Sequence, residues 1–485
     1  MPAKKKCLLG FDLGSSGGKG VIVDSEGNIL SFCSSSHETI RQNPGWAEQD
    51  AEISWWQGFK KISRRLLENS GIESSQIEAV GITGLVPGLC PLDVRGKVVR
   101  NAILHTDLRA YKELDSVSRI LPEPITLGCL IPKLIWFKDH EPENYKKTDK
   151  IVNPHSFIIY RLTGSITCDY DTATKTGGML DREKLKWDRA VCEELGVRRD
   201  ILPELLSAAS IAGGITGKAA EETGLLQGTP VIAGTGDSFS ALLGHGVISG
   251  GDLMIYLGSS GTQILVSRNL QELVNMPHFG PGKAEFAGRI VSSGDSMEHF
   301  RMMLGNKNWE TLNNGAEGVK PGSDRLIVVP HLKEKSEAKS SVFDRETVFG
   351  LVETHTSLHV YRALLEGIAY NLKDGFLTVR DKVRRVVLSG GGARSKVFGQ
   401  IISDILDFPV EVSLKGSGSL GIAFLAGYGT GLITDFKGTS AKWFSDYSII
   451  RPVPRNVAVY SKYYTFYKEL KKKLGALYEP LDLLP

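Results

Sequence analysis

Short apolar runs alternate with longer amphipathic stretches along this chain. The runs are rich in aliphatic residues and end at glycine or polar turn residues, which is typical of buried strands. The stretches repeat apolar residues at helical spacing. Alternation of these two patterns predicts an α/β fold. The predicted strands are residues 77–83, 231–236 and 385–389, and the clearest predicted helices are residues 358–372 and 397–406.

A five-residue motif, Leu-Gly-Ser-Ser-Gly, occurs at residues 13–17 and again at 257–261, about half the chain further on. Each copy stands between two β-rich segments, which predicts a hairpin. Matching flanks at this spacing indicate a duplicated domain. We therefore expect one domain over residues 1–247 and a second over 248–485.

The length of 485 residues supports this division, because one hydrophobic core does not normally extend through so long a chain. The glycines at residues 246–251 favour a boundary just before the second hairpin. Residues 305–325 are polar and rich in turn formers, so we expect a loop there.

The charge is nearly balanced, with 58 basic and 55 acidic residues and a net charge of +3. Such balance argues against a nucleic-acid partner. No apolar run approaches the roughly 18–20 residues that cross a membrane. The six cysteines lie in the first half with no CxxC spacing, which excludes the usual zinc motifs. Scattered thiols without an export signal predict a cytoplasmic protein.

Several glycine-rich segments are candidates for nucleotide binding. A P-loop is excluded, because Leu13 occupies the position of its first glycine. Gly416, Gly418 and Gly421 form a GxGxxG pattern, which fits either a dinucleotide fingerprint or a helix packed closely on a sheet. We prefer the packing interpretation, because the pattern lies far from any opening βαβ unit.

The two repeated turns are better phosphate candidates. Glycine lets backbone N–H groups converge on an anion, and serine hydroxyls add donors. Asp12 precedes the first turn, where a carboxylate would repel phosphate unless Mg²⁺ lay between them. Each turn alone is compatible with an ordinary hairpin; the pair favours an anion site.

Six segments along the chain form a recognisable series. They are residues 11–19 (FDLGSSGGK), 162–174 (LTGSITCDYDTAT), 234–237 (GTGD), 321–326 (PGSDRL), 363–368 (ALLEGI) and 389–404, which begins SGGGARS and contains Gln400 and Asp404. In the order and spacing of these segments, and over nearly its whole length, the chain resembles the FGGY family of carbohydrate kinases.

The resemblance implies an α/β fold of two duplicated ribonuclease H-like domains, as in actin-like ATPases, with a nucleotide cleft between them. Residues 1–247 would bind the sugar and hold the first phosphate loop, and residues 248–485 would hold the second loop and adenosine. The implied activity is ATP-dependent phosphorylation of a small sugar, ketose or polyol. The expected partner is that small molecule, with no nucleic acid and no membrane; a homodimer is left open.

The resemblance also assigns roles to residues. Asp237 would be the catalytic base, and Asp12 with Asp237 would bind Mg²⁺. Lys19 would add a cation near the phosphates. The other predicted ATP-binding residues are Gly14, Ser15, Ser16, Gly258, Ser259, Ser260, Gly391, Gly392, Ala393 and Ser395.

The sugar-binding segments depart from the family pattern. Xylulose kinases commonly show GQMHG after the strand at 77–83, and glycerol kinases an Arg-Glu pair, whereas this chain has Leu85, Val86 and Pro87. His105 stands where the family usually has tryptophan, followed by Asp107. We expect Val86, Pro87, His105, Asp107 and Asp237 to line the sugar site, with Asp107 either contacting hydroxyls or bracing the pocket. The sugar itself is left open.

Two other functions are compatible with parts of this pattern. A non-catalytic sensor of the same fold would bind sugar and nucleotide, although the retained Asp12 and Asp237 argue against it. An ATPase of the actin or Hsp70 type would act on protein partners. The i, i+4 pair His355 and His359 lacks the glutamate of an HExxH metal site, so we expect it to serve a helix start.

Overall fold

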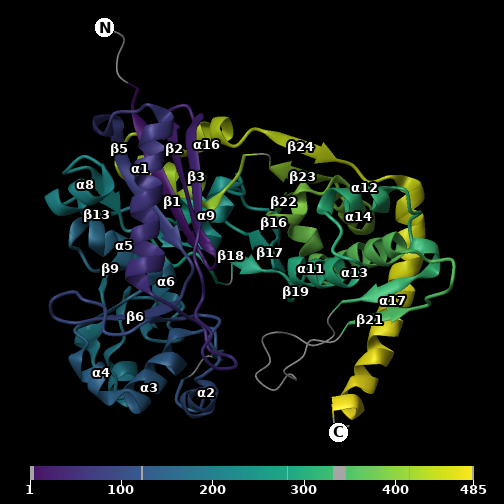
Figure 1. Ribbon diagram of the computed structural model, residues 1–485, viewed down its shortest axis with the longest axis horizontal. Coiled ribbons are helices and arrows are strands. Elements are labelled where there is room, and N and C mark those ends of the chain that lie inside the picture. The colour runs from purple at the N-terminus through teal and green to yellow at the C-terminus, as the bar shows by residue number, and fades with distance from the viewer. Residues whose placement is uncertain (1–4, 122–123, 281, 331–345, 414, 483–485) are drawn as a thin grey trace. The chain divides into compact units, whose positions relative to one another are not determined.

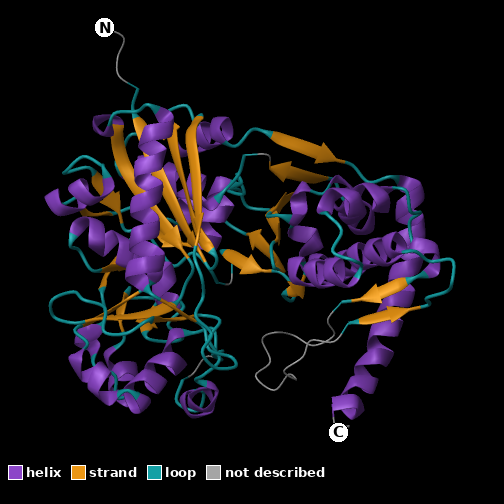
Figure 2. Ribbon diagram, in the orientation of Figure 1, coloured by secondary structure: helices purple, strands orange, loops and turns teal. Residues whose placement is uncertain are grey.

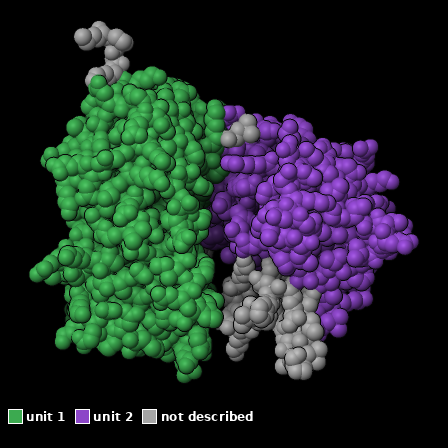
Figure 3. All heavy atoms as spheres, viewed as in Figure 1, with its two compact units in different colours: residues 1–248, 270–280, 415–445 green, residues 249–269, 281–414, 446–485 purple. Residues whose placement is uncertain are grey.

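The computed structural model describes residues 5–121, 124–280, 282–330, 346–413 and 415–482. Its chain forms two compact units (Figure 3). Unit 1 comprises residues 1–248, 270–280 and 415–445, and unit 2 comprises 249–269, 281–414 and 446–485. The first segment of unit 1 thus ends next to the expected boundary. Segments 270–280 and 415–445, which the sequence division placed in the second half, belong to unit 1.

The main sheet of unit 1 has seven strands within the described residues (Figure 1). At its centre, β1 (Cys7–Gly14) pairs antiparallel with β2 (Gly17–Asp24) and parallel with β5 (Ile77–Gly84). The first predicted hairpin and the strand at 77–83 are therefore confirmed. The remaining strands are β3 (Ile29–Ser36), β13 (Ile211–Gly214), β14 (Pro230–Ile232) and β15 (Thr235–Gly236), in the order β13-β14-β5-β1-β2-β3 with β15 on β5.

The single strand predicted over 231–236 is divided into β14 and β15. Gly234 lies between them with a φ of 69°, a left-handed conformation that breaks the strand. A Cβ on Gly234 would lie 2.1 Å from the carbonyl oxygen of Ile82, so only glycine fits this close approach.

Two helices pack on opposite faces of the unit 1 sheet. Phe11 of β1 contacts Phe59 of α1 (Gly58–Ser70) with ring centroids 5.0 Å apart. On the other face, a Cβ on Gly10 would lie 1.9 Å from the carbonyl oxygen of Ser419 in α15 (Gly418–Gly429). Because adjacent strand residues point to opposite faces, β1 is covered on both sides. This packing explains why residues 415–445 belong to unit 1.

A smaller sheet in unit 1 has the order β4-β7-β6-β8. Its strands are β4 (Glu48–Gln49), β7 (Ala102–Leu104), β6 (Gly88–Leu92) and β8 (Lys150–Val152). It shares a buried core with α3 (Leu130–His140), in which Leu89, Ile103 and Trp136 take part. Residues 84–87 therefore connect the main sheet to the smaller one.

Unit 2 repeats the topology of unit 1. Its β16 (Asp252–Leu257) pairs antiparallel with β17 (Ser260–Val266) and parallel with β22 (Arg385–Ser389), as β1 does with β2 and β5. The outer strands are β18 (Ala284–Phe286), β19 (Val291–Ser292), β23 (Val410–Ser413) and β24 (Tyr447–Ile450). Read from β24 to β18, strand order and directions match unit 1 from β13 to β3. The predicted duplication is confirmed.

The core of unit 2 joins this sheet to α13 (Ser357–Val379), α14 (Lys396–Leu406) and α17 (Pro454–Asp482). Both predicted helices are present, although α13 extends seven residues beyond residue 372. The loop predicted over 305–325 is wrong in part, because it contains α12 (Trp309–Glu317). Its buried Leu312 and Ala316 lie one helical turn apart, and Asn308 caps its start.

Figure 2 distinguishes the helices and strands of the two units by colour. Unit 1 also contains α2 (Tyr111–Val117), α4 (Pro142–Lys147), α5 (Pro154–Thr163), α6 (Tyr170–Thr174), α7 (Arg189–Glu194), α8 (Gly217–Thr223), α9 (Asp237–Gly244), α10 (Leu270–Leu273), α16 (Phe436–Trp443), β9 (Thr167–Asp169), β10 (Leu180–Asp181), β11 (Lys186–Trp187) and β12 (Glu204–Leu206). Unit 2 also contains α11 (Gly294–Met303), β20 (Ile327–Val329) and β21 (Thr347–Phe349). Among the described residues, no helix combines the length and apolarity needed to cross a membrane.

Candidate functional site

Two carboxylates flank the end of β5 in unit 1. On one side, Asp12 of β1 lies opposite Thr83. On the other side, Gly236 of β15 lies opposite Gly84, and Asp237 follows as the first residue of α9. Their backbones are thus two strand spacings apart, about 10 Å. Parallel pairing therefore brings together two acids that are 225 positions apart in sequence.

Asp12 lacks a full set of polar partners. Its Oδ1 is buried without a hydrogen-bond partner among the described residues. Burial, followed by the nearby charge of Asp237, raises the pKa of Asp12 to about 7, and Lys19 opposes this rise. Lys19 lies directly across the hairpin from Asp12. An orphaned carboxylate oxygen beside a second carboxylate is an arrangement that a cation would stabilise.

A chain of buried hydroxyl groups holds the backbone on either side of Asp237. The Thr83 hydroxyl donates to the carbonyl oxygen of Thr235 at 2.7 Å, and the Ser240 hydroxyl donates to Thr83 Oγ1 at 2.8 Å. The Ser238 hydroxyl donates to the carboxylate of Asp237 at 3.3 Å. Burial raises the pKa of Asp237, and the hydrogen bonds from Ser238 oppose that shift. The acid is therefore positioned by its neighbours on β5 and α9.

A second buried network lies next to Thr235. Its hydroxyl donates to Asp169 Oδ1 at 3.2 Å, and His155 Nε2 lies 3.5 Å from Asp169 Oδ2. Burial alone would raise the pKa of Asp169, but the hydrogen bond and charge of His155 bring it below its usual value. Sequence reasoning placed Asp169 in a family signature but missed His155, which only the fold brings to it.

Lys175 is a further residue that the sequence did not single out. It directly follows α6 and is half-buried, with Nζ 4.7 Å from the ring of Phe279. Nζ has no hydrogen bond or ion pair with any residue that the structure describes. Its charge lowers the pKa of Asp237.

The carbonyl groups of the first repeated turn are held by hydrogen bonds from other parts of unit 1. The carbonyl oxygen of Ser15 accepts hydrogen bonds from Gln49 Nε2 at 2.8 Å and Thr39 Oγ1 at 3.3 Å. The carbonyl of Gly14 contacts His37 Nε2, and the carbonyl of Ser16 accepts from the backbone N–H of His37. Within a planar peptide, C=O and N–H point in opposite directions. The N–H groups of Ser15, Ser16 and Gly17 therefore face away from these partners.

The second repeated turn is held in a similar way by the start of α11. The carbonyl of Gly258 accepts from the N–H of Gly294 at 2.8 Å, and that of Ser259 accepts from the N–H of Asp295 at 3.0 Å. Ser259 is exposed. The N–H groups of the following peptides thus point away from α11, as a phosphate-binding turn requires.

The glycine-rich turn at 390–395 packs against this second hairpin. A Cβ on Gly392 would lie 2.9 Å from Leu257 Cβ, whereas one on Gly391 would meet no heavy atom within 4 Å. The Ser395 hydroxyl accepts from the N–H of Phe398 at the start of α14 and donates to Asn313 Oδ1. Gly391 is therefore open to a ligand, while Gly392 serves packing and Ser395 serves helix capping.

The predicted sugar-binding residues cluster beyond the end of β5. Val86 and His105 are partly exposed, whereas Pro87 is buried. Asp107 is buried, and both of its carboxylate oxygens are occupied: Oδ1 accepts from Arg109 Nε at 2.8 Å and Oδ2 from the N–H of Ala47 at 2.5 Å. Of the two roles left open for Asp107, this geometry favours bracing.

Two other sequence features have structural roles. A Cβ on Gly421 would lie 2.0 Å from the carbonyl oxygen of Ser240, so the GxGxxG glycines allow α15 to approach α9. His359 forms a capping box with Thr356 at the start of α13. The described residues contain no cluster of three His, Cys, Asp or Glu side chains suited to a metal.

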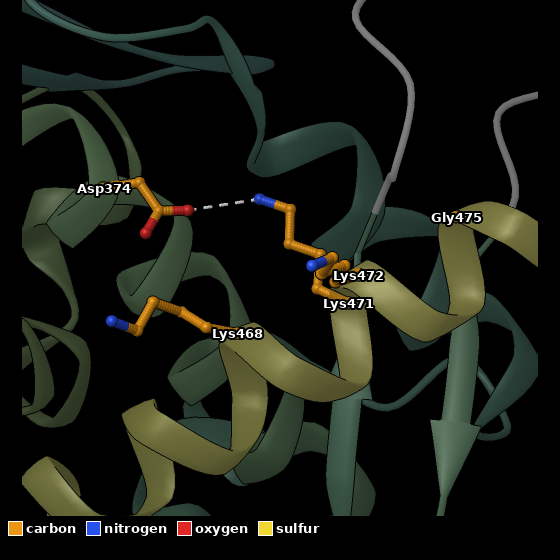
Figure 4. A pocket seen from close by; sticks show the side chains of 5 residues that line it. All are labelled: Asp374, Lys468, Lys471, Lys472 and Gly475. Carbon is orange, nitrogen blue, oxygen red and sulfur yellow. Dashed lines mark hydrogen bonds and ion pairs between the residues drawn. The ribbon is translucent and has the colours of Figure 1, made fainter.

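Unit 2 also contains a basic cavity of about 370 Å³ (Figure 4). Lys471 reaches across it to Asp374, with Nζ 3.2 Å from Oδ2. Lys468, Lys472 and Gly475 complete the described lining. The cavity lies on α13 and α17, not at the strand ends that carry the glycine-rich turns.

Comparison with known proteins connects this arrangement to one family. The chain matches models of the FGGY family of carbohydrate kinases, the N-terminal domain over residues 7–244 and the C-terminal domain over 242–430. It is 28% identical to xylulose kinase of Bacillus subtilis, with 96% of each chain covered.

Solved structures agree on the fold. The crystal structure of xylulose kinase from Rhodospirillum rubrum matches with a TM-score of 0.83 at 24% identity, covering 98% of this chain and 100% of the other. That of ligand-bound xylulose kinase from Lactobacillus acidophilus matches with a TM-score of 0.84 at 22% identity, covering 98% and 100%. The expected actin-like ATPase fold is thereby confirmed. The chain belongs to the FGGY family of carbohydrate kinases, enzymes that transfer a phosphoryl group from ATP to a sugar.

Proposed function

We propose that this enzyme phosphorylates a small ketose of about the size of xylulose, with Asp237 as the catalytic base. The observation that carries the proposal is the placement of Asp12 and Asp237 on either side of the end of β5. The relatives named xylulose kinase support the size of the sugar. The departures at residues 85–87 and at His105 are the reason why xylulose itself is not assigned.

In this mechanism the substrate hydroxyl lies within hydrogen-bond distance of Asp237. The carboxylate accepts the hydroxyl proton as the oxygen attacks the γ-phosphorus of ATP, and ADP leaves. The hydroxyl chain from Ser240 through Thr83 to Thr235 ties β15 and the start of α9, which carry Asp237, to β5. Catalysis then depends on positioning and on neutralising charge, since phosphoryl transfer needs little covalent assistance.

The carboxylates also fit magnesium. Carboxylate oxygens are the protein ligands that Mg²⁺ prefers, and Asp12 Oδ1 is buried without another partner among the described residues. We propose that Asp12, with Asp237, binds the ion directly or through water. When bound, Mg²⁺ supplies positive charge next to the phosphate oxygens.

Each unit contributes its own turn to ATP binding in this proposal. In unit 1, the N–H groups of the Gly14–Ser16 turn bind phosphate oxygens, and Lys19 adds positive charge. In unit 2, the N–H groups of the Gly258–Ser260 turn do the same, and the open backbone of Gly391 lets adenosine approach. The orientation of the carbonyl groups away from the ligand side supports these roles.

A substrate panel tests the proposal. Purified protein is mixed with Mg-ATP and a set of pentuloses, hexuloses and polyols, and ADP release is measured for each. We expect ADP release to depend on one small sugar and to be lost in the Asp237→Asn variant. Sugar-independent ATP hydrolysis, or turnover that survives in Asp237→Asn, would contradict the assignment of the base.

A further inference from the structure

The start of α5 packs against the turn that follows β5 in unit 1. A Cβ on Gly84, the last residue of β5, would lie 3.5 Å from His155 Cβ, and a Cβ on Gly88 would lie 2.7 Å from Pro154 Cδ. Asn153 Oδ1 accepts the N–H of Gly88 at 3.0 Å. His155 therefore lies beside the strand end that the two acids flank.

Asp169 connects His155 to β15, the short strand that precedes α9. Its Oδ2 lies 3.5 Å from His155 Nε2, and its Oδ1 accepts the hydroxyl of Thr235 at 3.2 Å. The same Oδ1 accepts the N–H groups of Asp171 and Thr172 at 3.1 Å each, which fixes the carboxylate to the start of α6. His155, Asp169 and Thr235 are each 0% exposed, so water cannot replace a contact that is lost.

The charge of His155 keeps Asp169 ionised in this buried position. Burial alone would raise the pKa of Asp169, but the hydrogen bond and charge of His155, with a smaller contribution from the charge of His278, hold it below its usual value. The other polar neighbour of His155 Nε2 is the uncharged Ser156 Oγ at 3.5 Å. An ionised carboxylate accepts stronger hydrogen bonds than a neutral acid, in which one oxygen becomes a donor. The bond from Thr235 to Asp169 therefore depends on His155.

Thr235 is held at its backbone as well as at its side chain. Its carbonyl oxygen accepts the hydroxyl of Thr83 at 2.7 Å, and β15 pairs with β5 as far as Gly236, which lies opposite Gly84. Asp237 follows directly as the first residue of α9. A shift of Thr235 would therefore move the backbone of Asp237, and misplacement of a reacting group by about 1 Å can slow a reaction roughly a hundredfold.

We infer that His155 is a positioning residue for the phosphoryl transfer, because through Asp169 and Thr235 it fixes the backbone that carries the Asp237 carboxylate. We call His155, Asp169 and Thr235 the contact chain. The inference rests on the proposed function, since it takes Asp237 to be the base. Because His155 acts through the other two residues, its loss should slow the chemical step and leave the binding of sugar and ATP nearly unchanged.

Thr235→Val tests the contact chain with the least disturbance. Valine keeps the shape of threonine and leaves the backbone carbonyl in place, but it removes the hydroxyl that Asp169 accepts. We expect kcat to fall by roughly tenfold to a hundredfold, while the KM values for sugar and ATP stay close to those of the wild type. Thr235→Ser, which keeps the hydroxyl, should retain most of the wild-type kcat.

Thr167→Val is the matched control for this substitution. Thr167 lies two residues before Asp169 on β9 and is also buried, and its hydroxyl has no hydrogen-bond partner among the described residues. The kcat of Thr167→Val should therefore equal that of the wild type. An equal loss of kcat in Thr167→Val and Thr235→Val would contradict the inference, because any buried change in this region would then slow the reaction.

His155→Gln tests the other end of the contact chain. Glutamine is polar but carries no charge, so kcat should fall by at least about fivefold. The double variant His155→Gln/Thr235→Val should have about the kcat of the slower single variant, since both substitutions interrupt one chain of contacts. Losses that multiply in the double variant would mean that the two residues act independently. If His155→Gln does not fold, the two Thr235 variants decide the case.

Asp237→Asn, measured beside these variants, separates the inference from the proposed function. If Asp237→Asn loses its turnover while Thr235→Val and His155→Gln keep the wild-type kcat, the positioning role is wrong and the assignment of the base stands. If Asp237→Asn keeps near-normal turnover, both are wrong.

Discussion

The two repeated hairpins share the same five-residue motif but differ in the register of their paired strands. In unit 1, Gly14 lies opposite Gly17, which leaves a two-residue turn. In unit 2, Leu257 lies opposite Gly261, which leaves three residues in the turn. A local sequence therefore does not determine its own turn length, because the backbone partners that surround it also contribute.

Those partners differ between the two units. In unit 1 the side chains of Gln49, Thr39 and His37 hold the carbonyl groups of the turn. In unit 2 the backbone N–H groups at the start of α11 hold them. Both arrangements leave peptide N–H groups on the opposite side of the turn, so each unit presents such groups through different contacts.

The residues at equivalent strand ends also differ. Asp12 precedes the first motif, whereas Tyr256 precedes the second. At the ends of the shared strands, unit 1 carries the acids Asp12 and Asp237, whereas unit 2 carries the glycine-rich turn at 390–392. The comparison leads us to expect chemistry from unit 1 and nucleotide binding alone from unit 2.

The largest expected effect is that of Asp237→Asn in unit 1. Loss of a general base lowers kcat by about 10²- to 10⁴-fold, and the KM for ATP should change little. Steady-state kinetics with the best sugar of the panel measure both. Asp115→Asn, an exposed acid of α2 in the same unit, is the control. Near-normal turnover of Asp237→Asn would mean that Asp237 is not the base. The assignment of the chemistry to unit 1 would then lose its main support.

The next effect compares the two residues that precede the motifs. Asp12→Asn should raise the Mg²⁺ concentration needed for half-maximal activity by more than the 10- to 100-fold that loss of an outer metal contact costs. Tyr256→Phe should leave that concentration unchanged, because a phenol is not a typical Mg²⁺ ligand. Titration of activity with MgCl₂ measures both variants. If both variants needed the same Mg²⁺ concentration, Asp12 would not be a ligand of the metal.

A smaller effect tests the supports behind the two turns. A Cβ on Gly294 would lie 2.6 Å from the carbonyl oxygen of Gly258, so Gly294→Ala should displace the second turn. Gln49→Ala should release the first turn, because it removes the hydrogen bond to the Ser15 carbonyl together with those to Thr39 and Trp55. Each variant should raise the KM for ATP by at least about fivefold, in line with roughly 1 kcal/mol per hydrogen bond.

The control for these supports is Gly58→Ala, where a Cβ would meet nothing within 4 Å. Its KM for ATP should equal the wild-type value. If Gly294→Ala raises this KM and Gln49→Ala does not, the two turns do not contribute equally to nucleotide binding.

The smallest effect concerns the basic cavity of unit 2. Lys471 is paired with Asp374 at a partly exposed position and also donates to Asn371 Oδ1 at 2.7 Å; the ion pair contributes about 0–1 kcal/mol and the hydrogen bond about 1 kcal/mol. Lys471→Met should therefore lower stability by about 1–2 kcal/mol in urea unfolding and leave kcat within about twofold of the wild type. A large loss of kcat would show that unit 2 contributes charge to the reaction.

Much of the framework could be read from local patterns. The hairpins, the strands at 77–83 and 385–389, and α13 and α14 follow from periodicity, because their buried faces repeat at strand or helix spacing. α12 was missed, because its asparagines and glycine indicate turns while its buried Leu312 and Ala316 are too few to outweigh them.

The residues of the candidate site also fall into those that the sequence predicted and those that it did not. Asp12, Asp237 and the two turns were identified by motif, and their roles as base, metal ligand and phosphate contacts stay predictions. The groups that support them, such as Gln49, Thr83 and His155, carry no motif. They could not be predicted, since each pairs with a residue on another element, 14 or more positions away in the sequence.

The sequence by itself determined the duplicated framework, because hydrophobic periodicity and glycine placement act over a few neighbouring residues. Only the tertiary structure decided the different registers of two identical motifs, the membership of residues 415–445 in unit 1, and the low pKa of His105. Each of these depends on backbone partners, close helix packing or burial supplied by distant segments. The close contact of Val86 with Gly236 belongs to the same class.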